Sequence, residues 1–165
     1  MRPTQTFGSY LMRRRVGVVD QDQKATHEVA ARLLHDYSRS LGAGDYDLYR
    51  GSFHLPCLVD VSGTARIISS ESELKRAYEA IRKYCKMHGV KDVVSTMVGV
   101  EQLTPKRLSL TGVLCLTKDK QVRLSSPFPV YLIADQIASS WRISCSIYCL
   151  VNAPDLTAAL EAKRA

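Results

Sequence analysis

Residues 53–84, FHLPCLVDVSGTARIISSESELKRAYEAIRKY, form the stretch of sequence that decides the fold. Its first half predicts a β-hairpin, because an apolar run is followed by a turn signal at Ser62-Gly63 and then by a second short apolar run. Its second half predicts a helix, because Ser70 and Glu73 have the three-residue spacing of a capping box.

The helix that follows this hairpin carries one apolar stripe and ends at Gly89. A single stripe indicates that the helix packs on an apolar surface. Residues 23–41 show the same spacing of three and four, which predicts an earlier long helix that stops at Gly42. The stripe of the second helix consists of Leu74, Ala77, Tyr78, Ile81, Tyr84, Cys85 and His88.

After Gly89 the apolar period changes from about 3.6 to 2, which predicts strands. Short turns between long strands favour an antiparallel meander. Pro127 and Pro129 remove ladder donors and predict an edge or a bulge at the start of the third long strand. A short helix is expected after Pro154. The four long strands are expected near 92–103, 107–117, 122–134 and 141–151.

This order predicts an α+β fold, with helices packed on the concave face of a strongly bent antiparallel or mixed sheet. Such a cone leaves a pocket between the helices and the sheet. Residues 21–165 are expected to form one domain that ends in the short helix. Residues 1–20 are expected to be a flexible basic arm, because they lack sustained periodicity.

The composition is that of an ordinary globular protein, with 45% hydrophobic and 24% charged residues. No apolar run reaches the roughly 20 residues that span a bilayer, so we expect no membrane partner and a cytoplasmic protein. The five cysteines form no CxxC pair and the four histidines are dispersed. This pattern predicts a reducing compartment, no metal site and no cofactor.

Of the formal net charge of +7, the first twenty residues carry +3 and the remaining 145 residues carry +4. Four arginines fall within the first twenty residues, whereas charges of both signs are scattered over the rest of the chain. Residues 21–165 contain no block of lysine or arginine residues of the kind that binds along a phosphate backbone. Nucleic acid is therefore not an expected partner.

The quoted stretch, with its capped helix after IISSESEL, resembles the SnoaL-like domain of the nuclear transport factor 2-like superfamily. The closing segment SSWRISCSIYCLV (139–151) is similar to that family's usual Gly-Trp-Arg-Ile last strand, with serine in place of the glycine. The resemblance covers about Gln23 to Val151.

The resemblance implies a cone-shaped α+β fold with an internal cavity, and commonly a homodimer formed through the outer sheet face. Members of the superfamily include isomerases, dehydratases, polyketide cyclases, transport adaptors and proteins of no known activity. A shared fold does not choose among these functions.

The family's catalytic members place an aspartate, or an aspartate with histidine and tyrosine, inside the cone. His54 is the best candidate for a catalytic residue here, because the first strand can line the pocket mouth. Asp60 lies beside the Ser62-Gly63 turn, where aspartate is ordinary turn chemistry. Cys57 shares the more apolar strand face, which favours core packing over nucleophilic work.

Tyrosines are the remaining residues that suit a small ligand, because each offers an apolar ring and one hydroxyl. The last strand alternates, with Trp141 on one face and small or polar residues on the other, which predicts either a dimer face or a solvent face. The ligand-pocket candidates are Tyr37, Tyr49, His54, Tyr78 and Tyr131, and the dimer-face candidates are Arg142, Ser144, Ser146 and Tyr148.

Three functions follow from these observations. The leading hypothesis is a SnoaL-like protein that forms a homodimer through the sheet and binds a small apolar ligand in the cone, without an evident catalytic set. The second is an enzyme of the isomerase, dehydratase or cyclase type, in which His54 and a tyrosine transfer a proton. The third is a dimerising or adaptor module that uses the sheet face and the basic arm. Whether the protein is an enzyme is left open by the sequence.

Overall fold

The computed structural model describes residues 12–118 and 122–162, with side chains from residue 21 onward. Helices come first and the long strands follow, which confirms the predicted α+β class. The elements in chain order are α1 (Met12–Ala43), α2 (Tyr46–Ser52), β1 (Phe53–Val61), β2 (Thr64–Ile68), α3 (Glu71–Met87), β3 (Asp92–Thr104), β4 (Arg107–Thr117), β5 (Phe128–Ile137), β6 (Ser140–Tyr148) and α4 (Pro154–Glu161).

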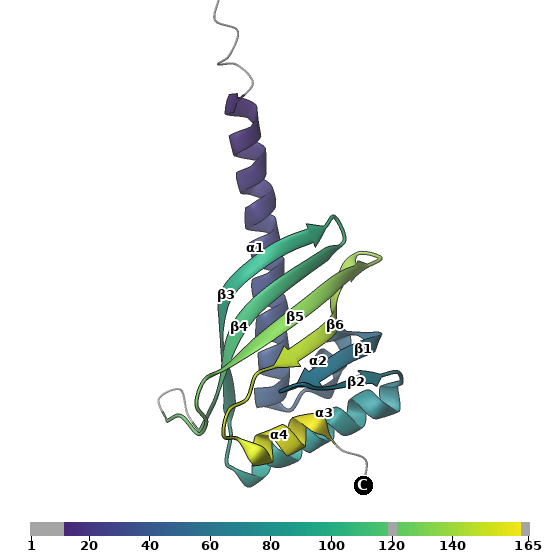
Figure 1. The fold of residues 1–165 in the computed structure, drawn as a ribbon, viewed down its shortest axis with the longest axis vertical. Coiled ribbons are helices and arrows are strands. Elements are labelled where there is room, and N and C mark those ends of the chain that lie inside the picture. The colour runs from purple at the N-terminus through teal and green to yellow at the C-terminus, as the bar shows by residue number, and fades with distance from the viewer. Residues whose placement is uncertain (1–11, 119–121, 163–165) are drawn as a thin grey trace, which may run out of the picture.

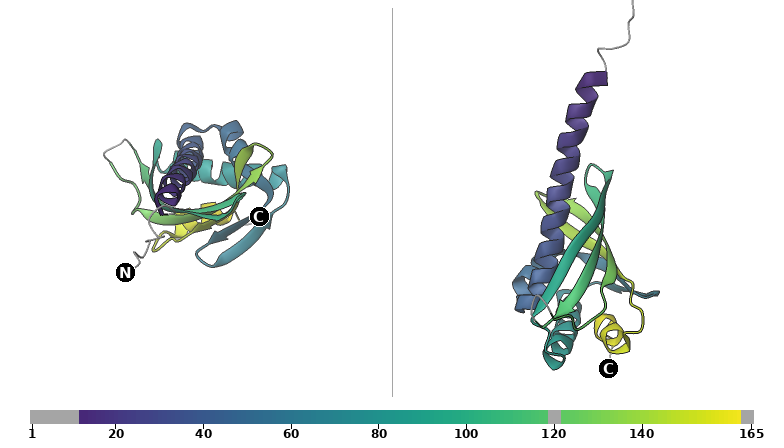
Figure 2. Two further views of the ribbon diagram at one scale, coloured as in Figure 1. Left: turned by 90° about the horizontal axis from the view of Figure 1, so that it is seen from above. Right: turned by 90° about the vertical axis from the view of Figure 1, so that its left-hand side faces the viewer.

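The six strands form one sheet in the order β2-β1-β6-β5-β4-β3. β1 pairs with β6 in parallel, and the other neighbours are antiparallel, so the sheet is mixed. The sheet bends around α1, which lies on its concave side, while α3 and α4 lie together across one end (Figures 1 and 2). This arrangement is the predicted cone with helices inside the bend.

Helix α1 begins at Met12, earlier than the expected start at residue 23. Its C-terminal half packs into the bend through Leu34, Tyr37 and Leu41, which are almost completely buried. Its N-terminal end projects beyond the sheet (Figures 1 and 2). The first eleven residues of the expected basic arm lie outside the described residues.

Gly112 on β4 lets α1 approach the sheet closely. A Cβ atom at this position would lie 2.8 Å from the Leu34 Cδ2 atom and 3.2 Å from the Thr96 carbonyl oxygen. The contact with Leu34 is closer than real Cβ atoms make, so a larger residue would require the Leu34 side chain to move. The close packing of α1 on β4 therefore uses the absence of a side chain here.

The β1–β2 hairpin has the predicted turn. Ser62 and Gly63 both have positive φ, at 51° and 92°, as the two central residues of a type I′ turn require. An Asp60 Oδ1 atom accepts a hydrogen bond from the Gly63 N–H group at 2.8 Å, so Asp60 does serve the turn. Ser62 Oγ ties this turn to the end of β6, accepting from the Leu150 N–H group at 3.0 Å.

The predicted capping box at the start of α3 is confirmed. Ser70 Oγ accepts from the Glu73 N–H group at 3.3 Å, and a Glu73 carboxylate oxygen accepts from the Ser70 N–H group at 3.3 Å. The helix ends before Gly89, whose φ of 67° is left-handed. The buried stripe of α3 consists of Leu74, Ala77, Tyr78, Ile81 and Cys85.

Two local features differ from the expectations. The segment before β1 is a short helix, α2, capped by Asp45, whose Oδ1 atom accepts from the Leu48 N–H group at 2.9 Å. The third long strand begins at Phe128, six residues later than expected, because Pro127 cannot donate to the ladder. The described residues before it make an isolated bridge between Arg123 and Thr117.

In the described part of the chain, the helices lack the combination of length and apolar character that crossing a membrane requires.

Candidate functional site

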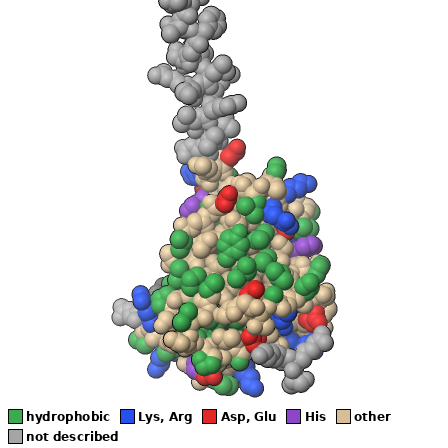
Figure 3. Space-filling view, viewed as in Figure 1, with side chains coloured by type: hydrophobic (Ala, Val, Ile, Leu, Met, Phe, Trp, Pro, Cys, Tyr) green, Lys and Arg blue, Asp and Glu red, His purple; other side chains and the backbone are tan. Residues whose placement is uncertain are grey.

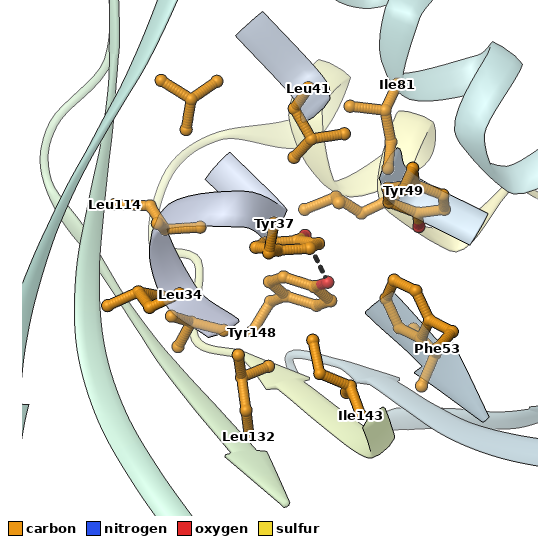
Figure 4. Packing of buried hydrophobic residues seen from close by; sticks show 14 of the residues in the cluster. Leu34, Tyr37, Leu41, Tyr49, Phe53, Ile81, Leu114, Leu132, Ile143 and Tyr148 are labelled. Atoms are coloured by element: carbon orange, nitrogen blue, oxygen red, sulfur yellow. Dashed lines mark hydrogen bonds between the residues drawn. The ribbon is translucent and has the colours of Figure 1, made fainter. Parts of the chain in front are cut away.

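The interior of the cone is occupied by aromatic side chains from several elements. Tyr37 comes from α1, Tyr49 from α2, Phe53 from β1, Tyr78 from α3 and Tyr148 from β6. Tyr49 is the centre of the group, with ring centroids 4.8 Å from Phe53, 4.9 Å from Tyr78 and 6.0 Å from Tyr37. Figure 4 shows Tyr37, Tyr49, Phe53 and Tyr148 converging.

The hydroxyl groups of Tyr37, Tyr78 and Tyr148 bond to one another or to the backbone. The Tyr37 and Tyr148 hydroxyl oxygens lie 2.5 Å apart (Figure 4). The Tyr78 hydroxyl donates to the Ser40 carbonyl oxygen at 3.3 Å. Burial raises the pKa of Tyr37, Tyr49 and Tyr148, so these groups remain neutral phenols and do not supply a base.

The cavity beside Tyr37 and Tyr148 is small. The cavity that core side chains of α1, α3, α4 and the sheet enclose has a volume of about 10 Å³. A volume of this size holds roughly one water molecule. Residues such as Leu41, Ile81 and Leu156 close it on the helical side.

His54 does not join the tyrosines. It follows the inward-facing Phe53 on β1 and is half-buried on the opposite, outer face of the sheet. Asp135 lies on the same outer face, close enough for His54 to help lower the pKa of the Asp135 carboxyl. Tyr131 also lies on that outer side, paired with Thr111 and Ile147. Of the five pocket candidates, the structure therefore brings together Tyr37, Tyr49 and Tyr78 only.

Cys57 is a core residue, as its strand face predicts. Its side chain is almost completely buried, and burial raises the pKa of the thiol to about 11. A thiol with this pKa carries very little thiolate at neutral pH, so it is not a nucleophile. Within the described residues, no three histidine, cysteine, aspartate or glutamate side chains gather as a metal ion would require.

The outer face of the sheet carries two adjacent rows of residues that pair across the strands. One row runs Ile67, Leu58, Cys145, Ile133 and Ser109, and the next runs Ala65, Asp60, Ile147, Tyr131 and Thr111. We call the apolar members Leu58, Ile67, Tyr131, Ile133 and Ile147 the outer apolar patch. Figure 3 shows hydrophobic side chains gathered over the middle of this face.

A charged row lies beside the outer apolar patch. Arg107, Asp135 and Arg142 are direct neighbours across β4, β5 and β6. Arg107 donates two hydrogen bonds to the Asp135 carboxylate, at 2.6 and 3.1 Å. These bonds lower the pKa of Asp135, so the row keeps its charges at neutral pH.

The structure corrects two of the four dimer-face candidates. Arg142 and Ser144 lie on the outer face and are half-buried, but Ser146 and Tyr148 point inward, with exposed fractions of 0% and 2%. A register shift of one residue in the β5–β6 ladder, next to Ser144, is the reason. A bulge reverses the facing of every later residue on the strand.

No protein-family model matches the sequence, and no curated protein matches it. Solved structures do match. A "NTF-2 like protein of unknown function" from Shewanella oneidensis is 16% identical, with a TM-score of 0.56 over 75% of this chain and 98% of that one. A "ketosteroid isomerase-like protein" from Erwinia carotovora atroseptica is 14% identical, with a TM-score of 0.59 over 76% of this chain and 96% of that one.

A third match is a domain of unknown function "with a cystatin-like fold" from Nostoc punctiforme, 10% identical, with a TM-score of 0.60 over 78% of this chain and 80% of that one. This chain has the nuclear transport factor 2-like fold. At these identities the likeness to solved structures establishes the fold alone. The narrower SnoaL-like resemblance stays a prediction.

Sequence reasoning missed the outer apolar patch of this nuclear transport factor 2-like sheet. Its residues come from β1, β2, β5 and β6, which are far apart in sequence, so their adjacency depends on the strand order. One signal was present in β5, where Leu132 and Ile133 are adjacent apolar residues. Successive residues of a strand point to opposite faces, so in a sheet with one solvated face apolar and polar residues alternate. Two adjacent apolar residues therefore indicate that both faces of the sheet are covered.

Proposed function

We propose that this chain is a SnoaL-like module that forms a homodimer through the outer face of its sheet and serves as a dimerising adaptor. The observation that carries this proposal is the outer apolar patch. An antiparallel sheet usually presents polar residues on the face that its own helices leave uncovered. Here that face carries Tyr131, Ile133 and Ile147 side by side on two strands, and none of the described helices lies over them.

The patch has the composition of a protein interface. Aromatic and aliphatic residues form its centre, and charged residues form its margin, as in typical interfaces. Leu58 and Ile67 extend the centre toward the sheet edge, with exposed fractions of 37% and 64%. These exposed side chains gain the most from being covered by a second copy.

The charges at the margin favour a second copy of the same chain as the occupant. The charged row holds both signs, Arg107 and Arg142 with Asp135, and Asp60 adds a carboxylate between Ile147 and Ala65. A two-fold dimer places the same surface on both sides, so it needs a surface that complements itself. A margin of both signs meets this need, whereas a margin of one sign would repel its copy.

A small apolar ligand in the cone, the leading hypothesis from sequence, has less support. Pockets for small organic ligands commonly measure about 300–1,000 Å³. The cavity among the core side chains measures about 10 Å³. Proton-transfer chemistry by His54 and a tyrosine also lacks support, because His54 lies on the opposite side of the sheet from Tyr37 and Tyr49.

Light scattering coupled to size-exclusion chromatography tests the proposal. The expected mass is twice the 18.4 kDa of one chain. Tyr131→Glu places a charge in the middle of the outer apolar patch and is expected to give monomers, because an interface does not tolerate an unpaired buried charge. Circular dichroism would show that this variant is folded.

Met87→Glu is the matched control. Met87 is 69% exposed on α3, outside the patch, so its replacement adds the same charge without touching the proposed interface. It is expected to remain dimeric. A wild-type protein that stays monomeric at high micromolar concentration would overturn the proposal, and so would a Tyr131→Glu variant that dimerises as well as Met87→Glu.

A further inference from the structure

A second cavity lies outside the aromatic core, at the end of the sheet where α3 and α4 lie (Figure 1). Its volume is about 410 Å³, within the range of about 300–1,000 Å³ that is common for small-ligand sites. Three separate segments form it: the end of α3, residues 124–129 leading into the start of β5, and residues 149–156 from the end of β6 to the first turn of α4.

One wall of this cavity is a stacked pair of rings. The Tyr84 and His88 ring centroids lie 4.0 Å apart, with an interplanar angle of 23°. His88 Nδ1 lies 3.0 Å from the Tyr84 carbonyl oxygen, which fixes the orientation of the imidazole. The faces of aromatic rings attract cations. Leu124 and Val151 line the cavity as well and are 38% and 79% exposed, so apolar contact area is free at its rim.

The cavity has one formally negative side chain. Among the described residues that line it, Asp155 is the single carboxylate, and no lysine or arginine is present. Asp155 has no ion pair or side-chain hydrogen bond with another described residue. Burial raises the pKa of Tyr84, and the nearby Asp155 carboxylate adds to this shift. The C-terminus of α3 contributes negative potential beside His88, whereas Asp155 itself lies in the first turn of α4, at the positive end of that helix.

We propose that this cavity binds small organic ammonium ions that carry an apolar or aromatic body. The ammonium group lies between the Asp155 carboxylate and the aromatic wall, and the body packs against Leu124 and Val151. An organic anion of the same size would meet the Asp155 carboxylate without a cation to compensate it, so the cavity discriminates by charge. The inference does not rest on the proposed dimer.

Benzylammonium is a suitable probe, and benzyl alcohol is its uncharged counterpart of nearly the same size. Titration of each would be followed by backbone amide chemical shifts. Benzylammonium is expected to shift the amides of the non-proline residues within 124–129 and 149–156 in a saturable way. Benzyl alcohol is expected to bind about threefold to tenfold more weakly, because it lacks the charge contacts.

Asp155→Asn removes the carboxylate and keeps the shape of the side chain. It is expected to weaken benzylammonium binding by about threefold to tenfold and to leave benzyl alcohol binding unchanged. Glu79→Gln is the matched control, since Glu79 is exposed on α3 outside the cavity and its replacement changes the net charge equally. This control is expected to bind benzylammonium like the wild type.

Equal binding of benzylammonium and benzyl alcohol by the wild type would overturn the proposal even if Asp155→Asn does not fold. Shifts in other regions, no saturable shifts, or equal losses in Asp155→Asn and Glu79→Gln would overturn it as well. The monomeric Tyr131→Glu variant is expected to bind benzylammonium normally. Failure of the dimer proposal is thus distinguishable from failure of this one.

Discussion

The two faces of strands β4 to β6 are built from similar residues but have different neighbours. On the inner face, Leu110, Leu132 and Ile143 are completely buried beneath α1 and the aromatic cluster. On the outer face, Ile133 and Tyr131 alternate with these residues and remain partly exposed. Burial of the inner apolar residues stabilises a single folded chain, whereas the outer apolar residues stay partly exposed in a single chain. The outer residues therefore indicate a function on the outside of the cone.

The largest expected effect compares two neighbours on β5. Leu132→Ala leaves a cavity in the closed core and is expected to lower the free energy of unfolding by about 3 kcal/mol. Ile133→Ala removes a side chain of the same size from the outer face and is expected to cost less than about 1 kcal/mol in the monomer. Urea unfolding of both variants in the monomeric Tyr131→Glu background measures the two values. Equal losses would show that the outer face is also covered within one chain.

The second-largest expected effect is the difference in thiol reaction rate between buried and exposed cysteines. The pKa of Cys57 is raised to about 11 by burial, which leaves about one thiol in a thousand ionised at pH 8. Cys149 is exposed, whereas the other four cysteines are buried. One fast-reacting thiol is expected with an aromatic disulfide reagent, about a hundredfold faster than the rest. Cys149→Ser should remove the fast phase, and two fast thiols in the wild type would contradict this picture.

The hydroxyl pair inside the cone gives a smaller effect. Tyr37→Phe leaves the buried Tyr148 hydroxyl without its partner and is expected to destabilise the protein by about 1–2 kcal/mol. The double variant Tyr37→Phe/Tyr148→Phe removes both groups and should cost less than the sum of the two single changes. Urea unfolding of the four proteins measures the coupling. Strict additivity would mean that the pair does not act as a unit.

The sequence predicted the features that depend on short-range signals. The capping box at Ser70 and the Ser62-Gly63 turn use residues within a few positions of one another, and both are present. Helix α2 was missed, although Asp45 at its N-terminus is an ordinary cap residue. The signal was present but was outweighed by Gly44 just before the helix and Gly51 within it.

Features that depend on pairing between distant strands could not be predicted. The bulge beside Ser144 arises from the β5–β6 ladder, and it turned Tyr148 from an expected outer residue into a core residue. The cavity near Tyr84 and Asp155 draws on three segments that meet only in the folded chain. The alternation of residues along one strand predicts which face of the sheet each side chain lies on, but only as far as the first bulge. It does not predict which strand is the neighbour.

The charged row at the margin of the outer face gives the smallest expected effect. Hydrogen bonds from Arg107 lower the pKa of Asp135 below its unfolded value of about 3.9. A lowered folded-state pKa adds stability above the unfolded pKa, and this stability is lost as the pH falls through the folded-state pKa. The stability difference between the wild type and Asp135→Asn should therefore be constant near neutral pH and shrink below about pH 4. Added salt should reduce this stability difference, because Arg107 is half exposed.

The control is Asp92→Asn, at an exposed aspartate outside the charged row. A pH profile of Asp135→Asn that parallels this control would mean that the Arg107–Asp135 pair contributes nothing to the outer face.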